Sequence, residues 1–278
     1  MRYLDAVDGS YQVALADGVL SLTFNRPEHG NAILSTAVLP MSQLLHSAQA
    51  DPLVRCLLIK GTGRVFCAGG DVVSFASALE QDVDTRQQDF ARRLGNIVGL
   101  VEALVAFDRP VVAVIRGAVA GAGLMFPLVA DYAIGDDSAK FVFAHQRVGL
   151  SPDCGVSYLL PQVVGTRTAR TLLLTAAKLD AEEALRHGIL SRIFAATELD
   201  LESARIAQQF TRLPQRAARL AKQLVNAATS NSLSVQLQVE RAAFVACVGD
   251  ADFAEGVAAF VEKRRADFPS TRAPSPQT

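Results

Sequence analysis

The chain has 278 residues, of which half are apolar and a fifth are charged, so it can bury the core of one large domain. A net charge of −1 without a basic stripe argues against nucleic-acid binding, and no apolar run approaches the roughly 18 residues that a membrane span needs. Four cysteines without paired spacing argue against disulfides and zinc and, with no signal-peptide pattern, indicate a cytoplasmic location.

The first part of the chain alternates between predicted strands and helices. Residues 19–24 alternate in hydropathy, which predicts a strand, and residues 25–31 have the composition of a loop. Ser35 is predicted to cap a helix that ends near Ala50. The next predicted elements are a strand over 54–60, a helix over 85–107, a strand from 111, a helix over 121–129, and strands at 132–134 and 141–143. This order predicts an α/β fold and leaves residues 72–84 unassigned.

The later part of the chain is predicted to be helical. Asp180 and Glu183 have the spacing of a capping box, and Gly188 would close that helix. Further helices are predicted over 198–212, 215–228, 231–248 and 252–265. We therefore expect a core over 1–197, a helical region over 198–268, and a disordered tail over 269–278, which is rich in Pro, Ser and Thr.

Two glycine-rich turns each follow an apolar run. The first is FCAGGD at residues 66–71, and the second is GAVAGAG at residues 117–123. Glycine lets backbone N–H groups approach a ligand oxygen without obstruction by a Cβ atom, and a following helix adds its dipole. Amide donors from two such turns could form an oxyanion hole for a carbonyl that gains negative charge.

An ordered set of motifs resembles the crotonase family, also called the enoyl-CoA hydratase/isomerases. The motifs are FNRPE (24–28) with NA (31–32), FCAGGD (66–71), the segment 109–123, GLSPD (149–153), LDAEEA (179–184) and EGVAAFVEKR (255–264). The resemblance covers about residues 10–268. It implies a spiral of ββα units with a C-terminal helical region, a homotrimer or dimer of trimers, and acyl-CoA thioester ligands. Neither residues 61–63 nor the 117–123 turn completes a dinucleotide or P-loop fingerprint, so we expect no nucleotide cofactor beyond the CoA moiety, and no metal.

The resemblance assigns binding roles by position. The oxyanion donors would be the backbone N–H groups of Ala68 and Ala122, and an alanine at 122 is acceptable if its φ is negative. The CoA moiety would be bound by the backbone near Ala68 and by four further residues, Arg26, Gly70, Phe260 and Lys263. In relatives, the residues at the positions of Phe260 and Lys263 often lie against the CoA of a neighbouring subunit. For Arg26 and Lys263, the alternative is a solvated surface charge.

Both glutamates that serve as the acid/base pair in hydratases of this family are replaced. Met125 stands at the first position and His145 at the second. A methionine cannot transfer a proton, so classical hydratase activity is doubtful. Met125 and His145 are expected to shape the acyl pocket. An oxyanion hole without the glutamate pair can still stabilise a thioester enolate.

Asp153 is the candidate base. Its surroundings resemble a branch of isomerases within this family in which an aspartate at this position shuttles the proton. Isomerising a 3-enoyl thioester requires removal of a proton at C2 and its return at C4, and one carboxylate that reaches both carbons can do both. The alternative is an ordinary turn aspartate.

His145 leaves several interpretations open. It could be structural, could position the substrate, or could act directly as an acid or base. A relative that hydrolyses C–C bonds in β-diketones pairs a histidine here with a downstream aspartate, so a hydrolase using His145 and Asp153 is an alternative. A weak hydratase and a non-catalytic acyl-CoA binder are the others.

Overall fold

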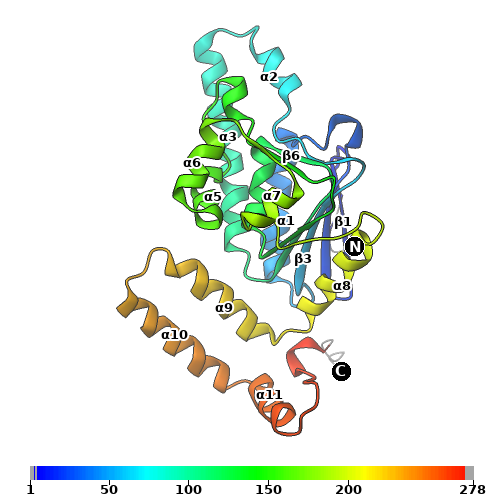
Figure 1. Cartoon of the computed structure of the whole chain (residues 1–278), viewed down its shortest axis with the longest axis vertical. Coiled ribbons are helices and arrows are strands. Elements are labelled where there is room, and N and C mark those ends of the chain that lie inside the picture. The colour runs from blue at the N-terminus through cyan, green and yellow to red at the C-terminus, as the bar shows by residue number, and fades with distance from the viewer. Residues whose placement is uncertain (1–2, 4, 273–278) are drawn as a thin grey trace.

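The computed structural model describes residue 3 and residues 5–272, and these form two sheets with covering helices (Figure 1). In spatial order the larger sheet contains β1 (Tyr11–Ala16), β2 (Val19–Phe24), β3 (Cys56–Gly61), β5 (Val111–Ile115), β7 (Tyr132–Gly135) and β10 (Arg192–Ile193). The smaller sheet contains β4 (Val65–Cys67), β6 (Ala118–Ala120), β8 (Lys140–Val142) and β9 (Lys178–Leu179). The pairs β1–β2 and β8–β9 are antiparallel, and the other neighbours are parallel.

The helices are α1 (Ser35–Ala50), α2 (Val72–Ala78), α3 (Val83–Ala106), α4 (Met125–Val129), α5 (Val156–Val164), α6 (Thr166–Leu174), α7 (Ala181–Arg186), α8 (Leu199–Thr211), α9 (Gln215–Ala228), α10 (Leu233–Val248) and α11 (Ala251–Val261). The described residues also form four short 3₁₀ turns, η1 (Pro27–His29), η2 (Gly121–Leu124), η3 (His145–Val148) and η4 (Pro269–Thr271). None of the described helices is long and apolar enough to cross a bilayer.

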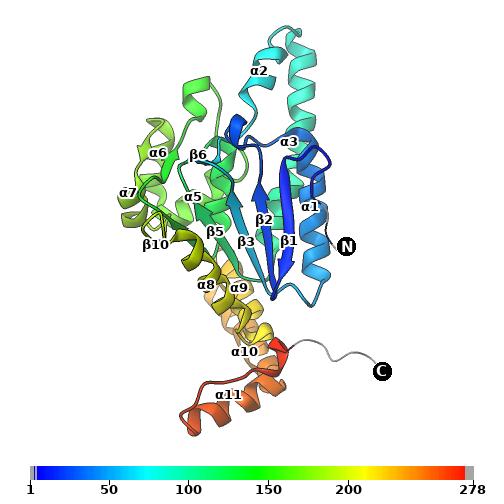
Figure 2. The same cartoon turned by 90° about the vertical axis from the view of Figure 1, so that its right-hand side faces the viewer.

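Alternate side chains of the central strands build a core on each face of the larger sheet. Leu58 and Val112 pack against α8, whereas Leu57 and Val111 belong to the cluster that contains α1 and α3. All five residues of β5 are buried, as expected for a parallel strand that is covered on both faces. Figure 2 shows α1 and α8 on the two sides of this sheet. The α/β architecture expected from the order of elements is confirmed.

Helices α9, α10 and α11 extend away from this core (Figures 1 and 2). They carry no large buried side chain, and Ala243 and Ala259 are the apolar residues that they bury. The helical region predicted after residue 198 is therefore present, and it packs only lightly against the rest of its own chain.

Several predicted boundaries need correction. Helix α1 begins at Ser35 itself, and the residue before it, Leu34, makes no side-chain capping bond, so the predicted Ser35 cap is wrong. The unassigned stretch after residue 71 contains α2, and the predicted helix over 121–129 is a 3₁₀ turn followed by α4.

The predicted disordered tail begins too early. Residues 269–271 form η4, because the N–H and hydroxyl of Ser270 both donate to the carboxylate of Asp252. Helix α11 ends at Val261 rather than at the predicted residue 265. The rest of the expected tail, 273–278, lies outside the described residues.

Candidate functional site

The two glycine-rich turns lie side by side because β4 and β6 are neighbouring parallel strands. Gly69 has a φ of +90°, and a Cβ atom on it would lie 2.6 Å from the carbonyl oxygen of Ala120 and 3.1 Å from the amide nitrogen of Ala122. A Cβ atom on Gly123 would lie 2.8 Å from the carbonyl oxygen of Cys67. Glycine is therefore required at both positions for the backbones to approach this closely.

The backbone hydrogen bonds correct one expected oxyanion donor. The N–H of Ala68 donates to the carbonyl of Gly30 at 2.8 Å, so this amide is already bonded. The N–H groups of Gly70 and Ala122 have no acceptor among the described residues. Ala122 is the second residue of η2, where an N–H has no partner within the turn, and its φ is not positive. The free pair of amides is Gly70 and Ala122, rather than Ala68 and Ala122.

These two amides open into a cleft of about 230 Å³. Ala68, His145 and Asp153 also line its polar part. The rest of the wall is mainly apolar and comes from α1, α2 and α3, with Val38, Phe75, Phe90, Leu94 and Ile97 as its main members. The cleft thus combines unbonded backbone donors and one His–Asp pair with an apolar chamber, which is the usual composition of a small-molecule site.

His145 and Asp153 are in direct contact in this cleft. Nε2 of His145 lies 3.1 Å from Oδ1 of Asp153. The histidine side chain is 7% exposed and the aspartate side chain 33%, so the carboxylate is the more accessible of the two. Nδ1 of His145 is buried and has no hydrogen-bond partner among the described residues. The ring is therefore held on one side only, by Asp153.

A tight reversal after Asp153 places its carboxylate. Cys154 and Gly155 both have positive φ, of 50° and 73°, immediately before α5. A left-handed conformation at a residue other than glycine is strained and persists where the surroundings enforce it. Burial and the neighbouring Asp153 carboxylate raise the pKa of the Cys154 thiol far above its ordinary value, so this cysteine stays protonated. Cys67 is likewise inert, because burial raises the pKa of its thiol to about 12.

The other expected site residues lie outside this cleft. Met125 is 1% exposed and packs in the core without lining the cleft, so its expected role in shaping the acyl pocket is corrected. Arg26 is half-buried and is also absent from the lining. Phe260 is 85% exposed on α11, and Lys263 follows that helix, at the end of the molecule away from α2 (Figure 1). The fold does not bring these two residues to the cleft of their own chain.

Sequence reasoning expected residues 72–100 to set part of the acyl pocket but named none of them, and they form the aromatic and charged end of the cleft. The rings of Phe75 and Phe90 pack edge to face, with centroids 5.0 Å apart. Arg93 lies 5.6 Å from the Phe90 centroid, and it pairs with Asp89 at 2.6 Å. The helical spacing of Phe90, Arg93, Leu94 and Ile97 was the available signal, but it did not show which chamber this face would line.

No group of three or more His, Cys, Asp or Glu side chains that could hold a metal ion occurs within the described part of the chain. Asp71, which also lines the cleft, caps α2 by accepting a bond from the N–H of Val73. The chemistry of the cleft therefore rests on His145, Asp153 and the backbone amides of the two turns.

Comparisons with known proteins agree with this geometry. The family model for enoyl-CoA hydratase/isomerase matches residues 15–271. The chain is 36% identical over 256 residues to the 1,2-epoxyphenylacetyl-CoA isomerase of Escherichia coli K12, covering 90% of this chain and 95% of that protein. It is 32% identical over 249 residues to a crotonyl-CoA hydratase of Syntrophomonas wolfei, and the match covers 89% of this chain and 93% of that protein.

A crystal structure of an enoyl-CoA hydratase from Polaromonas sp. JS666 superposes with a TM-score of 0.85 at 30% identity, covering 92% of this chain and 98% of that one. The similarity extends over both the sheets and the C-terminal helices. By its sequence, its paired glycine turns and its fold, the chain belongs to the enoyl-CoA hydratase/isomerase family.

Proposed function

We propose that this member of an acyl-CoA enzyme family shifts the double bond of an enoyl-CoA thioester. Asp153 removes a proton from C2 of a 3-enoyl thioester, and the electron pair of the broken C–H bond delocalises onto the thioester oxygen and C4. The same carboxyl group returns the proton to C4, so the double bond moves from C3–C4 to C2–C3. The amides of Gly70 and Ala122 stabilise the dienolate oxygen in between.

The observation that carries this proposal is that Asp153 lines the same cleft as the two free amides and makes no helix-capping bond, while Met125 is buried and does not line the cleft. Hydration needs an acid and a base around a catalytic water, whereas isomerisation needs one group that reaches two carbons. Asp71 also lines the cleft, but it is committed to the cap of α2. With a substrate in the cleft, the apolar wall would limit the access of water to the transferred proton.

His145 supports the same chemistry as a positioning residue. Its Nε2 contact holds Oδ1 of Asp153, and so restrains the carboxyl group that would meet the substrate. Loss of proton transfer costs about 100-fold or more, whereas loss of an orienting hydrogen bond costs about tenfold. The two residues can therefore be separated by the size of their effects.

Proton exchange in deuterated buffer tests the proposal. Wild type should convert 3-enoyl-CoA to 2-enoyl-CoA, and Asp153→Asn should lose this migration while still binding acyl-CoA. Asp71→Asn is the matched control, because asparagine caps a helix as well as aspartate does. Full activity in Asp153→Asn would eliminate Asp153 as the base. If wild type binds acyl-CoA without migration or label, the chain is a non-catalytic binder, and hydration without migration would make it a weak hydratase.

The contact between His145 and Asp153 favours a second candidate, a C–C bond hydrolase of β-diketones. In that reaction a histidine held by a carboxylate could activate water. This candidate predicts turnover of β-diketone substrates that His145→Ala abolishes. If His145→Ala still converts 3-enoyl-CoA to 2-enoyl-CoA, that result would favour the isomerase over the hydrolase.

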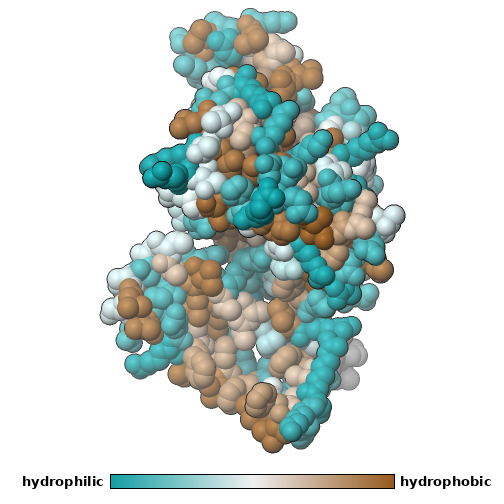
Figure 3. Space-filling model, in the orientation of Figure 1, coloured by the Kyte–Doolittle hydropathy of each residue, from teal (hydrophilic) through white to brown (hydrophobic). Residues whose placement is uncertain are grey.

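We further propose that the chain assembles as a homotrimer or a dimer of trimers. Brown, hydrophobic side chains gather over the lower helices in Figure 3, where α10 and α11 expose Phe244, Val245, Phe253, Phe260 and Val261. An exposed apolar area of this kind is typical of a protein interface. Phe260 and Lys263 would then reach the CoA of a neighbouring subunit.

Sedimentation equilibrium tests the assembly, and a monomer would contradict it. Partners other than acyl-CoA, and a location other than the cytoplasm, are not expected.

A further inference from the structure

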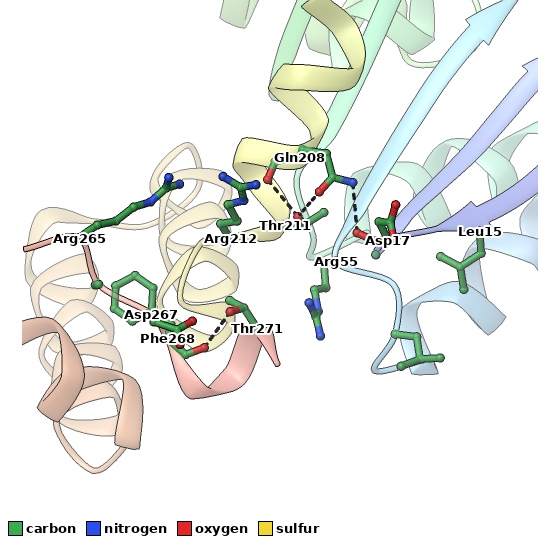
Figure 4. Close-up of a pocket in the computed structure, with 13 residues that line it drawn as sticks. Leu15, Asp17, Arg55, Gln208, Thr211, Arg212, Arg265, Asp267, Phe268 and Thr271 are labelled. Carbon is green, nitrogen blue, oxygen red and sulfur yellow. Dashed lines mark hydrogen bonds between the residues drawn. The ribbon is translucent and has the colours of Figure 1, made fainter. Parts of the chain in front are cut away.

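A hollow outside the cleft and the cleft itself differ in how their side chains are arranged. The hollow, of about 920 Å³ beside Arg55, Arg212 and Phe268, shares no lining residue with the cleft (Figure 4). Its Arg55 and Arg212 side chains point in different directions, so they do not converge on one ligand atom. In the cleft, by contrast, an aromatic side chain points directly at one of the two residues whose N–H groups have no acceptor among the described residues.

This aromatic side chain is Phe75 of α2, and the residue at which it points is Gly70. A Cβ atom on Gly70 would lie 3.0 Å from Cζ of Phe75, and 3.7 and 3.8 Å from its Cε1 and Cε2. Because Cζ is the nearest ring atom and the two Cε atoms are almost equidistant, the ring meets Gly70 with its tip. Both residues line the cleft, and Phe75 is half-buried. The ring therefore occupies the space that a side chain at residue 70 would need.

This contact explains the glycine at residue 70. The φ of Gly70 is not positive, in contrast to the φ of +90° at Gly69, so the backbone conformation at residue 70 does not call for glycine. Carbon atoms in ordinary van der Waals contact are about 3.5–4.0 Å apart, so a Cβ at 3.0 Å from Cζ would push the Phe75 ring away. Space, rather than φ, sets the residue type at this position.

The backbone around Gly70 is restrained by two contacts. The first is a parallel bridge between Ile33 and Gly70, in which the N–H of Ile33 donates to the carbonyl of Gly69 at 2.8 Å. The second is the tip of the Phe75 ring. Neither contact uses the N–H of Gly70, which therefore stays available as a donor for a ligand oxygen.

Phe75 is in turn held by α3. Its ring packs edge to face against Phe90, with the centroids 5.0 Å apart, and Arg93 donates to the hydroxyl of Ser74 at 3.3 Å. Ala78, one turn after Phe75 on the same face of α2, is buried. Helix α2 is thus seated through this face, and the ring of Phe75 connects the position of α3 to Gly70.

We infer that Phe75 is a positioning residue for the oxyanion donor of Gly70. Its ring tip limits the movement of this residue, so that the free N–H keeps one direction in the cleft. Direction matters because a hydrogen bond weakens steeply when it is misaligned, and loss of one oxyanion-hole donor lowers kcat by about 100-fold or more. The inference rests on the proposed role of the Gly70 amide, and it does not depend on Asp153 as the base.

Infrared difference spectroscopy of bound butyryl-CoA, isotope-labelled at the thioester carbonyl, tests the inference. Hydrogen bonds to the carbonyl oxygen weaken the C=O bond, so binding to wild type should lower its stretching frequency. Phe75→Leu keeps an apolar side chain in the cleft wall but is too short to reach Gly70. It should lose part of this frequency shift, and kcat for 3-enoyl-CoA should fall by about tenfold with KM nearly unchanged.

Val73→Ala is the matched control for Phe75→Leu. This side chain lies on the same helix, but it is 75% exposed and does not line the cleft. Alanine is also the better helix former, so α2 should persist. The frequency shift and kcat should therefore equal those of wild type, and a loss as large as that in Phe75→Leu would assign the effect to α2 in general and overturn the role of the ring.

A pair of reciprocal substitutions tests the contact itself. Gly70→Ala should lose much of the frequency shift, because its methyl group meets the ring of Phe75. Gly70→Ala combined with Phe75→Leu should recover part of that loss, since the methyl group then fills the space that the ring tip leaves. Two residues in contact give non-additive effects, so purely additive losses would overturn the inference.

The results distinguish this inference from the proposed isomerisation. A full frequency shift in Phe75→Leu would overturn the inference alone. A shift in wild type that Phe75→Leu reduces, without any migration of the double bond, would contradict the isomerase and still support the positioning role. If bound butyryl-CoA shows no shift in wild type, Gly70 and Ala122 form no oxyanion hole, and both proposals fail.

Discussion

Nε2 of His145 lies 3.1 Å from Oδ1 of Asp153, while Nδ1 of the same ring is buried and unpaired among the described residues. A His–Asp contact of this kind orients both side chains, because each group restricts the rotation of the other. The tautomer decides which atom donates, and Asp153 as acceptor requires the proton on Nε2. With the proton on Nε2 of a neutral ring, Nδ1 is a buried acceptor without a partner among the described residues.

His145→Phe should lower kcat for 3-enoyl-CoA by about tenfold and leave KM nearly unchanged, because it removes one orienting hydrogen bond and keeps the volume. His145→Gln should recover most of that loss, since its amide can donate to Asp153. Steady-state kinetics of the three proteins measure both constants. A loss in His145→Phe as large as that in Asp153→Asn would make His145 a direct participant.

Gly69→Ala should disrupt the oxyanion turns, because its Cβ would lie 2.6 Å from the Ala120 carbonyl at a φ of +90°. Such strain is worth about 1–3 kcal/mol, and relieving it would separate the amides of Gly70 and Ala122. We expect a lower melting temperature and a larger fall in kcat than in KM. Gly95→Ala is the control, because a Cβ there meets nothing within 4 Å, and this helical position should be neutral or stabilised. Equal activity in both variants would contradict the assignment.

Met125→Glu should not create a hydratase. The side chain is 1% exposed in the core, where an added carboxylate loses its hydration without gaining a partner. We expect a fall in melting temperature that is larger at neutral than at acid pH, because protonation removes the buried charge. Met125→Leu keeps the volume and should cost less than about 1.5 kcal/mol. Crotonyl-CoA hydration by Met125→Glu at unchanged stability would show that residue 125 reaches the cleft.

Glu255→Gln should weaken the C-terminal segment in a pH-dependent way. Hydrogen bonds from Arg264 and from the N–H of Asp267 hold the pKa of Glu255 at about 2, below its usual value of 4.5. Because the folded pKa is depressed, this contribution to stability is complete above the unfolded value of 4.5 and disappears as the pH falls towards 2.

The difference in melting temperature between wild type and Glu255→Gln should therefore be present at neutral pH and shrink as the pH falls from 4.5 to about 2. Glu80→Gln is the control, because Glu80 is exposed and has no ion pair in the described residues. A difference that persists unchanged below this range would rule out the ionised pair as its source.

Local patterns predicted the elements that local interactions stabilise. The capping box of α7 was readable because Asp180 and Glu183 satisfy each other's backbone N–H groups within one turn. Strand β2 has the bounds that its alternating hydropathy predicted. The Ser35 cap was wrong because a serine near a helix start is equally compatible with the first helical position.

In the candidate site too, the sequence predicted some features, while others depend on contacts between distant segments. The glycine spacing pointed to two close turns, but the sequence could not show that Gly30, far upstream, already accepts the N–H of Ala68. Asp153 and His145 were each singled out, yet their contact depends on η3 and on the left-handed residues Cys154 and Gly155. Phe75 and Phe90 escaped notice because only the packing of α2 beside α3 brings their rings together.

Residue type and spacing are enough to identify the α/β order of elements and the two glycine turns, and the resemblance to the family identifies the replaced glutamate pair. The folded chain shows which amides are free, that Met125 is buried, and that Phe75 packs against Phe90. Those outcomes depend on contacts between distant segments, and no local pattern of residues encodes which backbone group a distant carbonyl will bond.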